Sequence, residues 1–307
     1  MSAPGSQDRS PEEDTRAAPK TSGWGSPFPW DWLPELSLDH VTLVVDDLQS
    51  SAAKLELLLG RGRSWDGRRA PLAPENVAFR LEFSYLELVT SAAIQSQEAD
   101  WTDFFTGQKE GILSVAFRTR SLAETTLRVR ASGLTVDEAV MVTQAERDTS
   151  VERTWLCAQV RRTPGGAVTC SMIENRSPPV MRVAPEMVGG PAAIDDIVAV
   201  SLETERPFED RRIWRDQLGF KETPHGSGWK YDAGNAHITL MPLHRNQRSS
   251  MLWSGLTLTV RDPQRLRDRL ARRGVETLRS TSRDGQGLRL SLRGTEFRVV
   301  RAASVKR

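Results

Sequence analysis

The amino-acid sequence predicts an α+β fold in which four βαβββ units pair into two domains, each built on an open, cup-shaped mixed sheet. Three observations lead to this prediction. An alternating strand, a capped helix and a closing glycine follow one another four times along the chain. Each helix precedes a stretch that can supply three more strands, and one such unit cannot cover its own sheet, so the units must pair. A segment rich in proline and glycine separates the second unit from the third.

The elements follow the same order in every unit. The first strands are expected over 38–45, 112–119, 194–202 and 252–260. The helices begin at Asp46 or Asp47, at Ser121 in a capping box with Glu124, at Pro207, and at Asp262 followed by Pro263. They end at Gly60, Gly133, Gly219 and Gly274. The other strands are expected over about 62–69, 76–82 and 84–90, then 137–143, 153–160 and 167–174, then 220–223, 228–232 and 236–241, and finally 275–281, 287–292 and 295–300.

The order of the units gives the domain organisation. Residues 1–35 are rich in Ser, Pro, Gly and charge and are expected to form a disordered arm, whose tryptophan-rich end packs on the folded body. The first domain is expected over 36–176 and the second over 192–302. Residues 177–191 form the expected linker, and 303–307 a short tail.

Composition excludes several classes of protein. Hydrophobic residues make up 38% of the 307 residues and charged residues 27%, which is a globular balance. The net charge of +2 predicts no nucleic-acid partner. No stretch approaches 18 apolar residues and the first 20 lack the apolar core of a signal peptide, so no membrane association is expected. Two cysteines, Cys157 and Cys170, suit a reducing compartment, so a cytoplasmic location is expected. The expected assembly is a monomer or a homodimer.

Motifs in the first two units carry a resemblance to a known family. Leu38-Asp39-His40-Val41 at the start of a strand, a helix ending in Leu-Gly, and the stretch 85–89 resemble the first module of vicinal oxygen chelate proteins. The stretches 76–89, 152–155 and 172–174 are similar to the glyoxalase-like domain subfamily in particular. The resemblance covers about residues 36–302 and rests mainly on module order in the third and fourth units. It implies two glyoxalase-like domains, with up to four ligands in the first and last strands of their modules.

Strand alternation predicts which side chains enter the first cup. Because the apolar residues of 38–45 and 85–89 face the helix, His40, Tyr85 and Glu87 face the cup. The resemblance implies that the second module supplies the matching positions from Ser114 and Glu174. A serine hydroxyl is a poor metal ligand, so the implied set for a divalent ion (Zn, Ni, Mn, Fe or Mg) is His40, Glu87 and Glu174.

Two alternatives to a metal centre stay open for this cup. In one, Glu87 or Glu174 is a general base in a metal-free site, and Tyr85 orients a ligand or donates a proton. In the other, His40 and Glu87 simply hydrogen-bond each other and no chemistry takes place. Alternation also predicts that Cys170 shares the cup face with Met172 and Glu174, as an ordinary buried cysteine.

The matching positions in the second cup are Asp196, Thr239, Gly255 and Arg298, and His237 points the same way. Glycine has no ligand atom and arginine is cationic, so this set predicts no metal. Asp196, His237, Thr239 and Arg298 are candidate ligand-binding residues, with Arg298 able to hold an anion. The alternative is a second domain that only supports the first.

Two functions remain open on these grounds. The resemblance and the His40–Glu87–Glu174 set favour an enzyme of the lyase, isomerase or epimerase type that acts on a small oxygenated metabolite. The alternative is a non-catalytic protein that binds or sequesters a small molecule, like the bleomycin-resistance group. A protein that uses the tryptophan-rich arm to contact a partner is a third interpretation.

Overall fold

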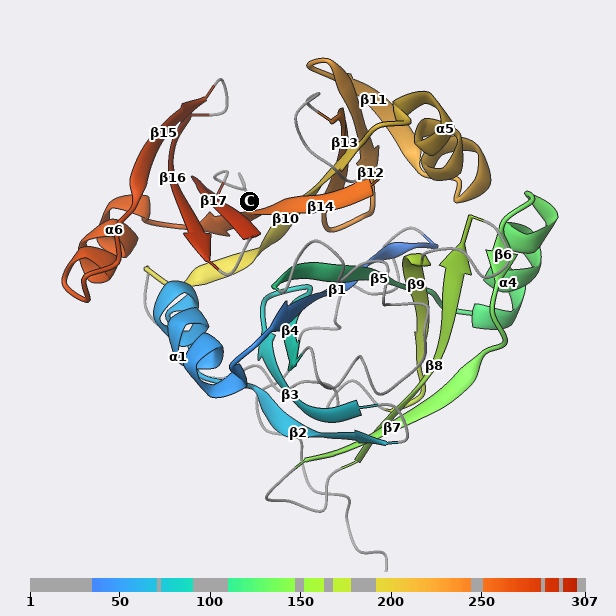
Figure 1. Ribbon diagram of the computed structural model, residues 1–307, viewed down its shortest axis with the longest axis horizontal. Coiled ribbons are helices and arrows are strands. Elements are labelled where there is room, and N and C mark those ends of the chain that lie inside the picture. The colour runs from blue at the N-terminus through green and yellow to red at the C-terminus, as the bar shows by residue number, and fades with distance from the viewer. Residues whose placement is uncertain are drawn as a thin grey trace, which may run out of the picture. The chain divides into compact units, whose positions relative to one another are not determined.

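The computed structural model describes residues 35–70, 73–90, 110–146, 152–162, 168–177, 192–243, 251–282, 285–292 and 295–302 (Figure 1). The expected arm except Glu35, and the expected linker except Ser177, lie outside these residues. Residues Leu33–Arg307 form one compact unit. Among the helices of the described ranges, none is long and apolar enough to span a membrane.

The first sheet contains the strands of the first two modules. Its elements are β1 (Ser37–Val45), α1 (Leu48–Leu59), β2 (Trp65–Ala70), β3 (Ala73–Arg80), β4 (Tyr85–Thr90), β5 (Gly111–Arg118), α4 (Leu122–Ala131), β6 (Thr135–Val136), β7 (Val140–Glu146), β8 (Glu152–Arg161) and β9 (Val168–Asn175). The strand order is β6-β8-β7-β2-β3-β4-β1-β5-β9, and β8 also pairs with β9. The α+β fold with curled sheets is thus confirmed. Because β2 pairs antiparallel with β7, this sheet also closes into a barrel around an interior.

Local capping explains where the helices of the first sheet begin and end. The carboxylate of Asp47 accepts a hydrogen bond from the Ser50 amide at 2.9 Å, and Ser121 caps α4 by accepting from the Glu124 amide. Gly60 ends α1 with a φ of 69°, in the left-handed region that glycine adopts without steric cost. The helix boundaries predicted from caps and glycines are therefore confirmed.

The second sheet contains the strands of modules three and four. Its elements are β10 (Ile194–Thr204), α5 (Pro207–Arg212), η4 (Ile213–Gln217), β11 (Lys221–His225), β12 (Gly228–Asp232), β13 (His237–Pro242), β14 (Met251–Val260), α6 (Pro263–Ala271), β15 (Leu278–Ser282), β16 (Gly285–Leu292) and β17 (Thr295–Arg301). The order is β11-β12-β13-β10-β14-β17-β16-β15, and no ladder among the described strands joins the two ends. The expected single helix after Pro207 widens into a π-helix at Ile213, which buries two consecutive large residues, Ile213 and Trp214.

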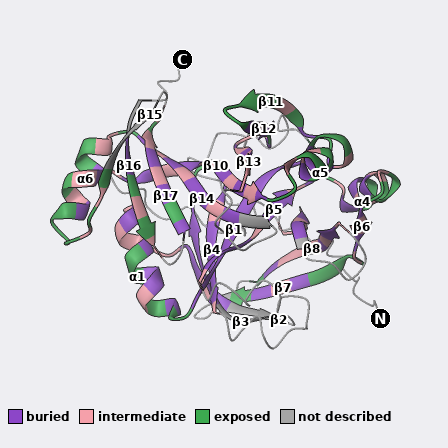
Figure 2. Cartoon of the chain, turned by 45° about the horizontal axis from the view of Figure 1, so that its top comes forward, coloured by how far each residue is buried: buried purple, intermediate pink, exposed green. Residues whose placement is uncertain are grey.

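The two sheets share one hydrophobic core. Apolar side chains from the helix-facing side of both sheets belong to a single cluster. Figure 2 shows in purple that many residues of the central strands are buried. Phe117 of β5 contacts Phe220, which precedes β11, and Trp214 of η4, with ring centroids 5.1 and 6.1 Å apart. Burial of such a side chain contributes about 1.5–3 kcal/mol to folding, so this core couples the sheets.

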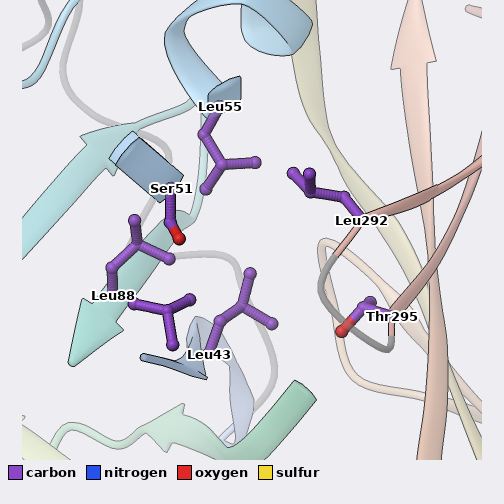
Figure 3. Close-up of a pocket in the computed structure, with 7 residues that line it drawn as sticks. Leu43, Ser51, Leu55, Leu88, Leu292 and Thr295 are labelled. Atoms are coloured by element: carbon purple, nitrogen blue, oxygen red, sulfur yellow. The ribbon is translucent and has the colours of Figure 1, made fainter. Parts of the chain in front are cut away.

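A small apolar cavity lies at the boundary between the sheets. It is lined by Leu43, Val45, Ser51, Leu55 and Leu88 of the first sheet and by Leu292 and Thr295 of the second (Figure 3). Its space holds about one water molecule at most, so it is a packing defect and not a substrate site.

Candidate functional site

The interior of the first barrel holds the candidate site. In the parallel ladder between β1 and β4, His40 lies beside Tyr85 and Thr42 beside Glu87. The neighbouring residue Val41 points outward into the core, so these side chains point inward. His40 is 7% exposed and Glu87 is 3% exposed, although both carry ionisable groups. Buried ionisable groups require partners, and each of these has them.

His40 is held by a hydrogen bond on Nδ1 and by a stacked ring on one face, and its Nε2 is turned toward Glu87. Its Nδ1 lies 2.9 Å from Oδ1 of Asp39, and its Nε2 lies 3.8 Å from Oε2 of Glu87. The Tyr85 ring stacks on the imidazole, with centroids 4.5 Å apart. Burial alone raises the pKa of Asp39, but the hydrogen bond with His40 and the charges of Arg118, His40 and Arg80 hold that pKa well below its usual range. Asp39 is therefore ionised and accepts the proton of Nδ1, so Nε2 faces Glu87.

Both carboxylate oxygens of Glu87 accept hydrogen bonds. Thr42 donates to Oε2 at 3.0 Å, and the Asn76 amide donates to Oε1 at 2.6 Å. The Gln144 amide in turn donates to Oδ1 of Asn76, and the Arg153 guanidinium donates to Oε1 of Gln144. Arginine has only donors, so the oxygen of Gln144 must face it, and this sets the orientation of both amides. This series of hydrogen bonds therefore presents an N–H donor, that of Asn76, to Glu87, which suits an ionised carboxylate.

Asn76, Gln144 and Arg153 were not predicted as site residues. Alternation could have placed Asn76 and Gln144 on the cup face. Nothing in the sequence shows that β2 pairs with β7 as well as with β3, which is the pairing that places the two side chains close together. Arg153 also lies over the Trp65 ring, 3.8 Å from its centroid. The barrel closure therefore created contacts that no local pattern encodes.

Glu174 does not join His40 and Glu87, so the expected placement is wrong. Its carboxylate accepts the Leu122 amide at 2.8 Å and pairs with Arg176 at 3.0 Å, at the N-terminus of α4. Cys170 and Met172, expected on the same cup face, are fully buried in the shared core, where burial raises the pKa of the Cys170 thiol to about 12. Ser171 lies beside Ala116 on the inward face, and all three residues are an odd number of positions from Ser171, so they face the helix side of β9.

The strand ladders give the correct counterpart. Between β1 and β5, His40 faces Ala116 and Thr42 faces Ser114; in the parallel ladders, Thr42 lies beside Glu87 and Ala116 beside Ser171. The two-fold relation between the modules therefore matches His40 with Ser114, as expected, and Glu87 with Ser171. The four matched positions of the first barrel hold one imidazole, one carboxylate and two hydroxyls.

This donor set does not fit the three-ligand metal centre that the resemblance implied. His40 and Glu87 are the only strong ligands at the four matched positions, and serine hydroxyls are poor partners for a divalent ion. Across the described part of the chain, no three His, Cys, Asp or Glu side chains gather in a way that could hold a metal ion.

The second sheet separates its expected site residues. In its ladders, the position that corresponds to His40 is Ala199, not Asp196, because β10 carries register shifts between Ile194 and Ala199. Asp196 instead binds the turn before β4 in the first sheet, so its expected place in the second cup is wrong. His237, Thr239 and Arg298 share the open face, and burial lowers the pKa of His237. Their ligand-binding role stays a prediction.

Comparisons with known proteins agree with this architecture. A hypothetical protein from Staphylococcus aureus has a TM-score of 0.64 at 11% identity, covering 87% of this chain and 99% of that chain. The Mn(II)-bound glyoxalase from Novosphingobium aromaticivorans has a TM-score of 0.56 at 13% identity, covering 86% and 81%. The 2,3-dioxygenase LapB from a Pseudomonas species has a TM-score of 0.54 at 14% identity, covering 87% and 92%. These identities show the fold alone.

Sequence comparison assigns the family. None of the curated proteins matches the sequence of this chain. The family model described as "Glyoxalase-like domain" matches residues 38–209, which is more than half of the chain and spans the first barrel from Leu38 onward. The chain therefore belongs to the glyoxalase-like domain family.

Proposed function

We propose that the interior of the first barrel is the site of a lyase, isomerase or epimerase that transfers a proton on a small oxygenated metabolite. The observation that supports this proposal most is the pairing of His40 and Glu87, whose Nε2 and Oε2 atoms lie 3.8 Å apart inside the barrel. At this spacing a carboxylate and an imidazole can both reach one small substrate, so that one takes a proton from it and the other returns a proton to it. Such chemistry needs no oxidant and leaves the atoms of substrate and product balanced.

Glu87 is the proposed base. The carboxylate is held by Thr42 and Asn76, so its position is fixed before a substrate binds. It would take a proton from a carbon next to a carbonyl group, which is the acidic position of an oxygenated metabolite. The donors that converge on it stabilise the ionised form that a base requires.

His40 and Tyr85 are the proposed partners of this base. Asp39 accepts from Nδ1 of His40, so Nε2 is the nitrogen turned toward the substrate side. In its imidazolium form His40 would donate the Nε2 proton to the enolate-like oxygen while Glu87 holds the proton taken from carbon. Tyr85 stacks on the imidazole and limits its rotation, and we propose its hydroxyl as a second proton donor. The four matched positions offer only two strong metal ligands, so the proposed proton transfers are assigned to the side chains of Glu87, His40 and Tyr85 and not to a metal ion.

A second candidate function rests on a different observation. The polar groups around Glu87 already satisfy one another, through Thr42, Asn76, Gln144 and Arg153. A satisfied network of this kind also suits a barrel that binds or sequesters a small molecule without changing it. On the second sheet, His237, Thr239 and Arg298 remain a proposed ligand-binding face of this type.

Proton exchange distinguishes the two functions. Ligands are first found by a thermal-shift screen of small oxygenated acids, thioesters and natural-product fragments. Each hit is then incubated with the protein in D2O, and NMR follows the proton on the carbon next to the carbonyl. The enzyme exchanges that proton for deuterium catalytically. If the protein only binds the ligand, the ligand raises its melting temperature but the proton does not exchange. This result for every hit tested would overturn the catalytic proposal.

A further inference from the structure

The second sheet holds the turn that leads into the site strand β4. Asp196, at the start of β10, accepts the Ser84 hydroxyl on Oδ1 at 2.5 Å and the Phe83 amide on Oδ2 at 3.2 Å. The Glu82 amide donates to the backbone oxygen of Asp195 at 2.9 Å. Ser84 is fully buried and Asp196 is 5% exposed. Three consecutive residues of the first sheet are therefore fixed by two residues of the second.

This turn lies directly before the site. Ser84 precedes Tyr85, the first residue of β4, and Glu87 follows two positions later. The Tyr85 ring stacks on His40, so the placement of Ser84 sets how this ring meets the imidazole. Because Ser84 and Tyr85 are consecutive, a displacement of the backbone at Ser84 is expected to move Tyr85 as well.

The neighbouring site strand is tied to the second sheet at the same end. The Leu38 amide of β1 donates to the backbone oxygen of Ala233 at 3.1 Å, two residues before His40. The Arg118 guanidinium donates to the backbone oxygens of both Leu38 and Phe83, which joins the starts of β1 and β4. The strands that carry His40, Tyr85 and Glu87 therefore begin at one common anchor.

A carboxylate suits this anchor better than its amide. Asp196 meets donors on both oxygens, because the Ile197 amide also donates to Oδ1 at 2.9 Å. An asparagine would turn its own NH2 group toward the Phe83 amide or toward Ser84 and Ile197, where donors already lie. The guanidinium groups of Arg80 and Arg61 are close enough to interact with its charge. The residue is thus matched to the turn and not merely enclosed by it.

We propose that Asp196 is a positioning residue for the site in the first barrel, holding the turn Leu81–Ser84 so that Tyr85 and Glu87 meet His40. This assigns the second sheet a part in the function of the first, although its own matched positions hold no comparable set. The inference rests on the proposed function only in taking the barrel interior as the working site. The contact itself is independent of any substrate.

Fluorine NMR tests the proposal on the whole protein. The chain has two tyrosines, Tyr85 and Tyr231, so labelling with 3-fluorotyrosine gives two resonances, which Tyr85→Phe assigns. We expect Asp196→Asn to shift the Tyr85 resonance by more than its linewidth. Tyr231 is buried in the second sheet, and its resonance is expected to stay in place, which reports an intact core.

A neighbouring aspartate provides the matched control. The Asp195 carboxylate pairs with Arg261 at 3.4 Å, and only its backbone oxygen contacts the turn, so Asp195→Asn is expected to leave the Tyr85 resonance unmoved. Ser84→Ala approaches the same contact from the first sheet and is expected to shift that resonance as Asp196→Asn does.

Three results would overturn the proposal. The first is an unmoved Tyr85 resonance in both Asp196→Asn and Ser84→Ala. The second is an equal shift in Asp195→Asn, and the third is a shift of Tyr231 as large as that of Tyr85, because either would mean a diffuse change of packing. If no substrate is ever turned over but Tyr85 responds as described, the proposed function fails while this positioning role stands.

Discussion

His40 and Glu87 face each other inside the first barrel, with Nε2 and Oε2 3.8 Å apart, while Asp39 holds the other nitrogen of the same imidazole at 2.9 Å. The three groups come from two adjacent parallel strands, so their spacing follows from the ladder between β1 and β4. This arrangement makes Glu87 the residue whose charge decides between the enzyme and the ligand-binding protein.

Glu87→Gln tests that charge. The amide can still accept from Asn76, and the Thr42 hydroxyl can rotate to accept from it, so folding is expected to be nearly unchanged. A positioned base contributes on the order of 100-fold or more, so turnover of a true substrate should fall by at least that factor, as measured by steady-state kinetics. In a protein that only binds its ligand, the change alters one hydrogen bond of about 0.5–1.5 kcal/mol, and calorimetry would show affinity falling about tenfold at most.

Glu174→Ala is expected to lower the free energy of unfolding and to leave turnover nearly unchanged, which is the reverse of the result expected for Glu87→Gln. The Glu174 carboxylate accepts the Leu122 amide at the start of α4, and loss of such a cap costs about 0.5–2 kcal/mol. Urea unfolding is therefore expected to show a lower free energy of unfolding, while turnover per folded molecule stays near that of the parent. A turnover loss comparable to that of Glu87→Gln would return Glu174 to the site.

Gln144→Leu should destabilise the barrel from within. Gln144 joins Asn76 to Arg153, and all three side chains are buried. Leucine removes the donor to the buried Asn76 oxygen and one acceptor of the Arg153 guanidinium, and the lost donor alone is expected to cost about 1–3 kcal/mol. Gln264→Leu, at an exposed position of α6, is the control and should change the free energy of unfolding by less than about 0.5 kcal/mol. Equal effects of the two changes in urea unfolding would mean that the interior chain contributes nothing.

Local signals predicted the modules well, because each one is complete within a few residues. Asp47, Ser121 and Asp262 cap their helices through their own side chains, and Gly60 ends α1 by its left-handed conformation. Alternation predicted the inward direction of His40 and Glu87, because the ladder between β1 and β4 is regular through both residues.

The errors arose where distant strands decide the register. Asp196 lies three positions before the true counterpart of His40, since β10 has bulges that counting along the sequence does not reveal. Glu174 lies three positions after Ser171, and an odd displacement turns a side chain to the opposite face of the sheet. The contact between Asn76 and Gln144 depends on the pairing of β2 with β7, which no pattern within one module encodes.

Asp196 should give the stability of the protein a specific dependence on pH. Burial raises the pKa of Asp196 to about 6, although hydrogen bonds from Ser84, Ile197 and Phe83 oppose the rise. In the unfolded chain the pKa returns to the ordinary value of 3.8, so between these two values the folded state binds more protons than the unfolded state. The contribution of this group to the free energy of unfolding must therefore decrease as the pH rises from about 4 to about 6, and then stay constant. Asp39 has the opposite shift and acts at lower pH, so the difference between the wild type and Asp196→Asn isolates the effect. Urea unfolding at several pH values from 4 to 8 should show the wild type losing stability relative to Asp196→Asn up to about pH 6, and two parallel curves would show that Asp196 titrates normally despite its burial.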